Sequence, residues 1–274
     1  MKKLLFLLLI IGVIIGCSRK QYISKPVAAL HDTVYIKVQI PPFIPVETTN
    51  PIDSILYDAH TAGTPNFNLR KPNFVIIHHT AQDSCGQTFY TFRLMRTKVS
   101  AHYVICKDGT VSHILSNYLR AWHAGISKWG NITDINSVSI GIELDNNGYE
   151  PFPEKQINSL LFLLDTLKRT YNIPPTNFIG HADIAPIRKD DPSVFFPWKL
   201  LAQKGYGLWQ DSIPPTLTID SSFKPMEALR IIGYSTKDTT KAIIAFKRHF
   251  LQDTTPSLKE QDKKVLYTLY KKYL

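Results

Sequence analysis

Residue types that could bind a metal ion occur at two widely separated places in the sequence. His78 directly follows the apolar run 74–77, and His181 is followed ten residues later by Asp191. A catalytic zinc ion commonly takes three protein ligands from His and carboxylate side chains and leaves its fourth position to water. His78, His181 and Asp191 could supply such a set if the fold brings two strand ends together. The spacing alone does not distinguish this set from ordinary polar residues at strand ends.

Short apolar runs and helical spacing predict the elements that would position these residues. We expect strands at 74–78, 101–106, 111–115, 137–144 and 178–181. The segment 107–110, Lys-Asp-Gly-Thr, is typical of a hairpin turn. Pro153 suits the first turn of a helix, and helical apolar spacing continues to Tyr171. Strands that alternate with helices in this way predict an α/β fold with a central mixed β-sheet flanked by helices.

The predicted strand 137–144 has two different faces. Ile140, Ile142 and Leu144 alternate with Ser139, Gly141 and Glu143, and successive side chains of a strand point to opposite faces. We therefore expect an apolar face that packs on the core and a second face that carries Glu143.

The character of the sequence changes in its last sixty residues. Three amphipathic helices are expected there, at 226–233, 239–250 and 257–273. We interpret 67–212 as one domain and 213–274 as a smaller C-terminal three-helix domain, which is near the lower size limit for independent folding.

The first residues have the pattern of a secretory signal. Lys2 and Lys3 precede the apolar run 4–15, which is shorter than the roughly 20 residues that span a bilayer. Ile14-Ile15-Gly16-Cys17 resembles a bacterial lipobox. We expect 1–16 to be a lipoprotein signal peptide and Cys17 to carry the lipid, with several acyl chains for stable anchoring. The proline-punctuated segment 17–66 is expected to be a tether.

The charge and the cysteines bear on partners and compartment. The formal net charge is +10, and it is +8 without Lys2 and Lys3. A basic protein could bind nucleic acid, but the secretory signal argues against this partner and favours acidic wall polymer or anionic lipid. A merely soluble basic surface is the alternative. Cys85 and Cys106 could form a disulfide outside the cytosol, although the sequence does not show whether their geometry permits it.

Five segments in the region 72–198 together resemble N-acetylmuramoyl-L-alanine amidase family 2, which is related to the peptidoglycan-recognition proteins. They read Val-Ile-Ile-His78-His79-Thr80, Ser100-Ala-His102-Tyr-Val-Ile, Ala121-Trp-His123-Ala-Gly, Ser139-Ile-Gly-Ile-Glu143-Leu and Gly180-His181-Ala-Asp183-Ile-Ala-Pro186. The segments 228–234 and 242–250 are similar to a peptidoglycan-binding helical domain. The whole arrangement resembles the lipoprotein amidases of the Gram-negative outer membrane.

The resemblance implies both the reaction and the site. It implies hydrolysis of the amide bond between N-acetylmuramic acid and L-alanine, in peptidoglycan or in muropeptides, for wall turnover or recycling. His78, His181 and Asp191 match the zinc ligands of the family. Glu143 matches the acidic residue that acts on the zinc-bound water, and Lys189 matches the catalytic lysine. General acid–base catalysis by Glu143 and oxyanion stabilisation by Lys189 are physically suited to amide hydrolysis.

Other residues of these segments have two interpretations each. His123, Trp122 and Arg188 are candidates for substrate binding. His123 could equally be structural, Trp122 could be a core or rim aromatic residue, and Arg188 could pair with a neighbouring acid instead.

A second group of residues is expected to support the site rather than bind the metal ion. His79 is expected in a supporting role, His102 as a structural hydrogen-bonding residue, and Asp183 as a brace of its own loop. Asp190 leaves an ambiguity of one position at the third ligand, and the spacing from His181 favours Asp191.

Two rivals come from other functional classes. A peptidoglycan receptor without catalysis would lack zinc ligands, and a structural lipoprotein would bind wall without zinc. We expect instead a monomeric zinc enzyme of the cell envelope, anchored by lipid in the outer membrane.

Overall fold

The computed structural model describes residues 68–210 and 212–274, which belong to one compact unit. The expected signal peptide 1–16, the lipidation site Cys17 and the whole expected tether 17–66 lie outside the described residues. Among the described helices, none is long and apolar enough to cross a membrane.

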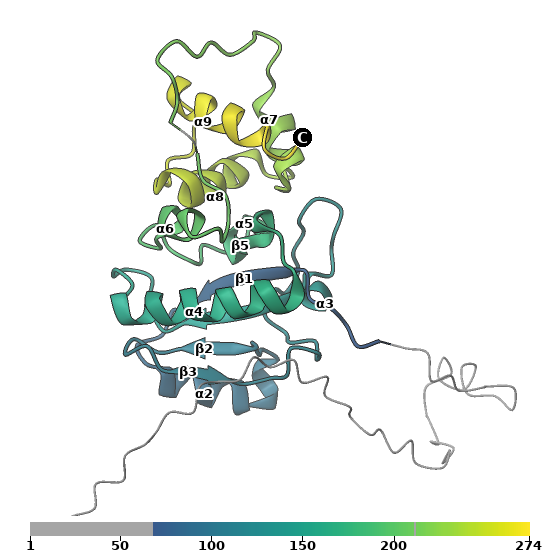
Figure 1. The fold of residues 1–274 in the computed structure, drawn as a ribbon, viewed down its shortest axis with the longest axis vertical. Helices are drawn as coiled ribbons and strands as arrows, with labels where there is room; N and C mark the ends of the chain where they lie inside the picture. Colours follow the sequence, from purple (N-terminus) through teal and green to yellow (C-terminus); the bar gives the residue numbers. More distant parts are fainter. Residues whose placement is uncertain (1–67, 211) are drawn as a thin grey trace, which may run out of the picture. The chain divides into compact units, whose positions relative to one another are not determined.

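A five-stranded mixed sheet forms the centre of the fold (Figure 1). Its strands are β1 (Phe74–His79), β2 (Tyr103–Ile105), β3 (Val111–His113), β4 (Ser139–Leu144) and β5 (Phe178–Gly180), in the order β3-β2-β4-β1-β5. The pairs β1–β4, β1–β5 and β2–β4 are parallel, and only β2–β3 is antiparallel. The expected α/β fold with a mixed sheet is therefore confirmed, and the hairpin turn at 107–110 joins its antiparallel pair.

One face of the sheet packs on a long helix. Helix α4 (Glu154–Tyr171) buries Leu160, Leu164 and Leu167 in the same core as Ile140, Ile142 and Leu144 of β4. The opposite faces of β4 and β1 carry the polar residues of the site. Since the pleat alternates side chains, the strand that fills the core also presents Glu143 to the other side, as its sequence predicted.

Short helices and turns connect these strands. They are α2 (Cys85–Arg93), η1 (Met95–Thr97), α3 (Ile135–Val138), η2 (Pro175–Asn177), α5 (His181–Ile184) and α6 (Trp198–Gln203). Helix α3 corrects the expected start of the strand at 137: the Ser137 hydroxyl donates to Asp134 Oδ2 at 2.5 Å, which favours a helical turn before Ser139. The strand expected at 101–106 is shorter than predicted at both ends, and the strand expected at 111–115 is shorter at its carboxyl end.

Three helices follow, as the sequence predicts: α7 (Pro225–Ile232), α8 (Thr239–Leu251) and α9 (Glu260–Tyr270). Helix α8 packs against α5 and α6. The three helices bury Leu229, Phe246 and Leu266 in one core with Phe74 and Ile76 of β1. The division into domains at 212/213 stays a prediction, and this shared core joins the helices to β1 on the side of the sheet that carries His78.

Candidate active site

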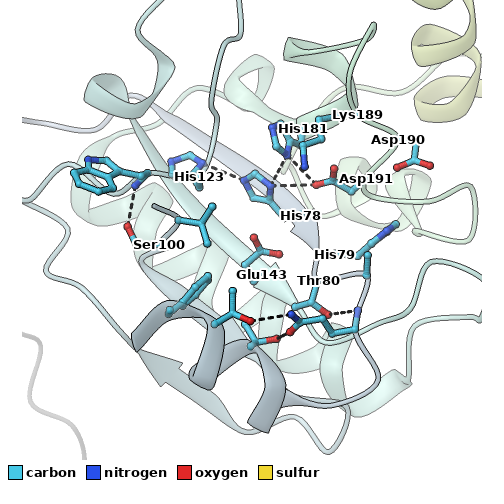
Figure 2. Close-up of a pocket in the computed structure, with 17 residues that line it drawn as sticks. His78, His79, Thr80, Ser100, His123, Glu143, His181, Lys189, Asp190 and Asp191 are labelled. Carbon is cyan, nitrogen blue, oxygen red and sulfur yellow. Dashed lines mark hydrogen bonds and ion pairs between the residues drawn. The ribbon is translucent and has the colours of Figure 1, made fainter. Parts of the chain in front are cut away.

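A cavity opens at the carboxyl ends of β1 and β4, where the residues singled out from the sequence come together (Figure 2). It is lined by His78, His79, Thr80, Ala81, Gln82, Thr88, Thr91, Phe92, Val99, Ser100, Trp122, His123, Glu143, His181, Lys189, Asp190 and Asp191. His78 and Glu143 are register partners in the parallel pair β1–β4, and β5 delivers His181 on the other side of β1. Parallel strands thus bring residues that are 65 and 103 positions from His78 to one edge of the sheet.

Three donor atoms converge within this cavity. The Nδ1 atoms of His78 and His181 lie 2.9 Å apart, and each lies 3.1 Å from Asp191 Oδ2. Three donor atoms that lie about 3 Å from one another can all bind one zinc ion at about 2.0–2.2 Å. All three side chains are buried, whereas Asp190 is exposed. The structure places Asp191, rather than Asp190, beside the two histidines, and this donor set fits a zinc ion.

Hydrogen bonds behind the three donors fix which nitrogen atoms face the cavity. His181 Nε2 lies 3.1 Å from the carbonyl oxygen of Ala124, to which it donates, so Nδ1 keeps its lone pair. His78 Nε2 lies 3.0 Å from His123 Nδ1. His123 Nε2 lies 3.1 Å from Ser139 Oγ, whose hydroxyl donates to the carbonyl of Ile135 at 2.6 Å.

Only one arrangement of donors and acceptors satisfies all of these hydrogen bonds. The Ser139 hydroxyl donates its hydrogen bond to a carbonyl oxygen, so Ser139 Oγ accepts a hydrogen bond from His123 Nε2–H. His123 Nδ1 then accepts from His78 Nε2, which leaves the lone pair of His78 Nδ1 for a metal ion. Gly141 makes the arrangement sterically feasible, because a Cβ there would lie 2.4 Å from Cγ of His123. The structure thus places His123 as a buried partner of His78 on the cavity wall.

The pKa shifts favour the protonation states in which these side chains bind metal. Burial, followed by the nearby His181, lowers the pKa of His78 to about 4, and Asp191 acts in the opposite direction. Burial opposes ionisation of Asp191, but the two histidines hold the pKa of this carboxyl well below its ordinary value. Burial also lowers the pKa of His123 well below 6.5, with His78 as the next contribution. Neutral imidazoles and an ionised carboxylate are the ligating forms.

Glu143 is half-buried, and its carboxyl group, with Oε2 enclosed, is directed at the same place. Its Oε2 atom has no hydrogen-bond partner among the described residues. Burial, followed by the charge of Asp191, raises the pKa of Glu143 to about 8, and Lys189 acts in the opposite direction. An unpaired buried carboxyl with a pKa near neutrality suits a group that takes up and returns a proton.

The sequence of this region is similar to known proteins. Residues 68–194 match the family model described as N-acetylmuramoyl-L-alanine amidase, Amidase_2. Over 207 residues the chain is 34% identical to the N-acetylmuramoyl-L-alanine amidase AmiD of Escherichia coli K12, covering 64% of this chain and 74% of AmiD. The chain belongs to the N-acetylmuramoyl-L-alanine amidase family.

Solved structures agree with this assignment of an amidase. A complex of Escherichia coli AmiD superposes with a TM-score of 0.67 at 29% identity, over 79% of this chain and 95% of that one. AmpDh3 of Pseudomonas aeruginosa superposes with a TM-score of 0.66 at 28% identity, over 79% and 97%. Both alignments extend well beyond residues 68–194 of this amidase.

The three candidates for substrate binding have different positions in the amidase. Trp122 is 53% exposed and lines the cavity, so its ring is available to a bound molecule. Arg188 does not line the cavity; its Nη2 donates to the carbonyl oxygens of Ala124 and Ile126. His123, the third candidate, is buried on the cavity wall beside His78. Lys189, the predicted catalytic residue, also lines the cavity and lies beside His181 (Figure 2). A role in substrate binding stays a prediction for all three candidates.

The supporting residues lie where the sequence predicted. His79 Nδ1 accepts from the backbone N–H of Ser193 and so holds the loop that carries Asp191. His102 is fully buried, and its Nδ1 accepts from the N–H of Gly141. Asp183 Oδ2 accepts from the N–H of Gly180 at 2.7 Å, which braces the turn before His181.

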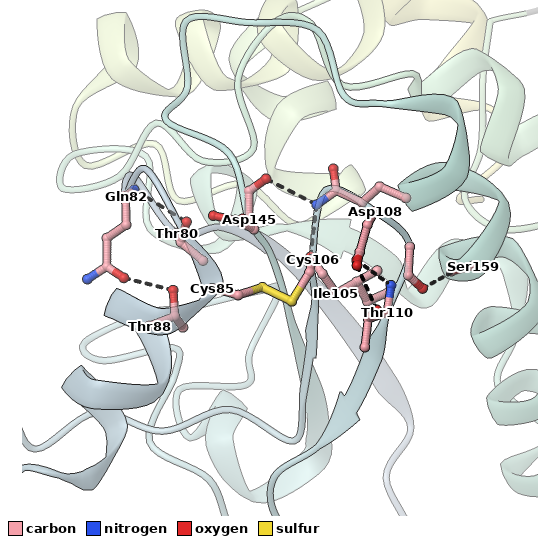
Figure 3. Close-up of a disulfide and its surroundings, with 12 residues drawn as sticks. Thr80, Gln82, Cys85, Thr88, Ile105, Cys106, Asp108, Thr110, Asp145 and Ser159 are labelled. Carbon is pink, nitrogen blue, oxygen red and sulfur yellow. Dashed lines mark hydrogen bonds between the residues drawn. A yellow bond between two sulfur atoms is a disulfide. The ribbon is translucent and has the colours of Figure 1, made fainter.

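The wall of the cavity opposite His78, His181 and Asp191 comes in part from α2, a helix that the sequence did not predict. Gln82 links Thr88 and Thr91: its Oε1 accepts from Thr88 at 2.7 Å and its Nε2 donates to Thr91 at 3.1 Å. A disulfide between Cys85, the first residue of α2, and Cys106, just after β2, ties this helix to the sheet with Cα atoms 5.7 Å apart (Figure 3). The pairing that the sequence left open is therefore present.

Sequence analysis also missed the groups that orient the histidines. Asn136 Oδ1 accepts from the N–H groups of both His123 and Ala124 and positions that segment. Ser139 could have been found, because it shares the polar face of its strand with Glu143. The carbonyl of Ala124 could not, because a backbone oxygen leaves no trace in the sequence.

Proposed function

We propose that this amidase uses zinc to hydrolyse the amide bond between N-acetylmuramic acid and L-alanine in peptidoglycan or in muropeptides, for wall turnover or recycling. The observation that carries the proposal is the convergence of His78, His181 and Asp191 beside the unpaired carboxyl of Glu143. Neutral water is a poor nucleophile and an amide carbonyl is a poor electrophile. A metal ion at this site would polarise the carbonyl, and Glu143 would accept a proton from the water.

Each residue of the site has a distinct role in the proposed reaction. A zinc ion held by His78, His181 and Asp191 would acidify a water molecule and polarise the amide carbonyl. Glu143 Oε2 accepts the proton of the attacking water and then donates it to the departing amide nitrogen of L-alanine. The ammonium group of Lys189 stabilises the negative charge that develops on the carbonyl oxygen. The balanced products are a free muramyl carboxyl group and a stem peptide with a free amino group.

The structures of relatives support this substrate class. The solved Escherichia coli AmiD is a complex with the substrate anhydro-N-acetylmuramic acid-L-Ala-D-gamma-Glu-L-Lys. AmpDh3 of Pseudomonas aeruginosa has been solved with anhydromuramic pentapeptide. Because Trp122 lines the cavity and is exposed, we propose that its ring packs against the sugar.

The remaining parts of the chain suggest where the enzyme works. The lipobox-like segment that ends at Cys17 supports a lipid anchor in the cell envelope, and we propose that this anchor lies in the outer membrane of a Gram-negative bacterium. The Cys85–Cys106 disulfide is typical of an oxidising compartment. We further propose that α7–α9 contribute to peptidoglycan binding and that the enzyme acts as a monomer.

The test is product analysis with a chain that starts at Ser18 and so lacks the anchor. Muropeptides would be incubated with this chain before zinc removal by a chelator, after removal, and after zinc is restored, and the products would be identified by mass spectrometry. We expect stem peptides that begin with L-alanine, loss of this product after chelation, and its return with zinc. Tight binding without cleavage in the presence of zinc would instead support a peptidoglycan receptor.

A further inference from the structure

A buried carboxylate next to the zinc ligand His181 has more donors than its own turn provides. Asp183 is 2% exposed and lies in the four-residue helix α5, two positions after His181. Its Oδ2 accepts from the N–H of Gly180 at 2.7 Å, and this bond closes the turn on which His181 stands. Two further donors, also at 2.7 Å, are the hydroxyl of Tyr234 to Oδ1 and Nδ1 of His249 to Oδ2.

Both additional donors come from the C-terminal helices. Tyr234 follows α7, and His249 lies in the last turn of α8. They are themselves held against the amidase core: the ring of His249 stacks on Trp198 of α6 at 3.9 Å, and the ring of Tyr234 meets Trp129 edge-on at 5.0 Å. The positions of both donors are therefore determined by packing between the helices and the sheet domain.

A second contact between the same parts reaches the other support of His181. Gly130 donates its N–H to the carbonyl of Gly233 at 2.8 Å, and a Cβ at Gly233 would lie only 2.4 Å from the ring of Trp129. The segment that contains Trp129 also includes Ala124, whose carbonyl accepts from His181 Nε2. The C-terminal helices thus contact both structures that orient this imidazole.

The position of α5 affects two zinc ligands together. His181 is its first residue, and the N–H of Ala182 donates to the carbonyl of Asp191 at 2.7 Å. A carboxylate buried beside this turn needs its hydrogen bonds, because an unpaired buried charge is strongly unfavourable. Without Tyr234 and His249, Asp183 would keep one donor, and it would have to rotate towards water and release Gly180.

We propose that the C-terminal helices are part of the metal site: Tyr234 and His249 act as positioning residues that hold Asp183, and through it the turn that carries His181. This inference rests on the proposed zinc dependence. It goes beyond a wall-binding role for these helices, and it predicts that their removal lowers the affinity of the site for the metal ion. Partners of metal ligands in the surrounding structure commonly change metal affinity by about 10–100-fold.

The experiment compares zinc affinity among full-length variants by competition with a chromophoric chelator. The test variant combines Tyr234→Phe with His249→Phe, which keeps both aromatic rings and removes both donors. We expect its zinc affinity to fall at least about tenfold. His249→Asn, combined with wild-type Tyr234, provides an Nδ2–H near the position of the imidazole Nδ1–H and should restore most of the affinity that His249→Phe alone removes.

A control is needed for simple destabilisation of the helices. Lys247 is buried in α8 and pairs with Asp253 and Asp262, both outside the active site. Lys247→Met should therefore lower the thermal unfolding temperature of the chain while zinc affinity of the folded protein stays within about twofold of wild type. Equal loss of zinc affinity in this control and in the double variant, at matched unfolding temperatures, would mean that Tyr234 and His249 are only structural.

The outcomes separate this inference from the proposed function. Tight zinc binding by the wild type together with unchanged binding by the double variant overturns the inference alone. A wild-type chain that binds no zinc overturns both. Weakened binding by the double variant, rescue by His249→Asn and near-normal binding by Lys247→Met support the positioning role.

Discussion

The buried carboxyl of Glu143 makes a quantitative prediction about the metal-free protein. Its pKa is raised from 4.5 to about 8, first by burial and then by the charge of Asp191. At pH 7 this carboxyl is ionised in the unfolded chain and protonated in the folded one, so folding takes up a proton and stability falls as pH rises from 4.5 to 8. pH 7 lies about 2.5 units above 4.5, and each unit corresponds to about 1.36 kcal/mol. Glu143 therefore lowers the free energy of unfolding at pH 7 by about 3 kcal/mol relative to low pH.

Glu143→Gln removes this titration and keeps the shape of the side chain. The Gln amide is left as unpaired as the protonated carboxyl of Glu143, whose Oε2 has no partner among the described residues, so the desolvation terms nearly cancel. We expect the metal-free variant to be more stable than the wild type by about 3 kcal/mol at pH 7, with the gain falling towards zero at pH 4.5. A bound zinc ion favours the carboxylate, and so the gain should shrink when zinc is added.

The assay is thermal unfolding of both metal-free chains at pH 4.5, 6, 7 and 8. For a folded region of this size, 1 kcal/mol corresponds to about 2–4 °C, so the variant should unfold about 6–12 °C higher at pH 7. The exposed Glu154→Gln is the matched control and should change stability by less than about 1 kcal/mol at every pH. A gain that does not depend on pH, or a loss at pH 7, would refute the reasoning. Despite its greater stability, Glu143→Gln should lower kcat by about 10²–10⁴.

Two further predictions concern the walls of the site. His123→Phe removes the acceptor for His78 Nε2 and should weaken zinc binding about 10–100-fold in chelator competition; equal affinity of variant and wild type would contradict the proton arrangement that runs from His78 to Ser139. The double change Cys85→Ala and Cys106→Ala opens a link between residues 21 positions apart and should lower stability by about 3 kcal/mol in thermal unfolding. A reducing agent should lower the unfolding temperature of the wild type towards that of this variant, and no effect on the wild type would argue against the disulfide.

Local patterns in the sequence predicted those features of the site that depend on local geometry. The alternation in 139–144 placed Glu143 on the face opposite the core, because the two-residue period of a strand acts within a few residues. The structure confirms this through Ile140, Ile142 and Leu144, which pack with α4. The strand start was wrong by two residues, because the Asp134–Ser137 hydrogen bond favours a helical turn that strand propensity does not capture.

Local patterns could not predict which residues far apart in the sequence come into contact. His78 and His181 are 103 positions apart, and only a resemblance to a known family indicated that they meet. The bonds from Tyr234 and His249 to Asp183 connect helices whose amphipathic spacing predicted their existence but not what they pack on. Which surfaces pack together depends on their shapes. Those shapes arise only in the folded chain, so a local sequence pattern does not reveal them.

The parallel pairing of β1 and β4 has a consequence for how this enzyme can change over time. His78 faces Glu143 across the ladder, so their separation is set by the spacing of two hydrogen-bonded backbones rather than by the chain between them. The loops between residues 80 and 138 that lie outside β2, β3 and the segment of His123 can therefore gain or lose residues without altering the distance between His78 and Glu143. A single residue inserted within Ser139–Leu144, however, would turn Glu143 into the core and an isoleucine towards the substrate. Variation in specificity should accordingly accumulate in the connections, while the lengths of these two strands stay fixed.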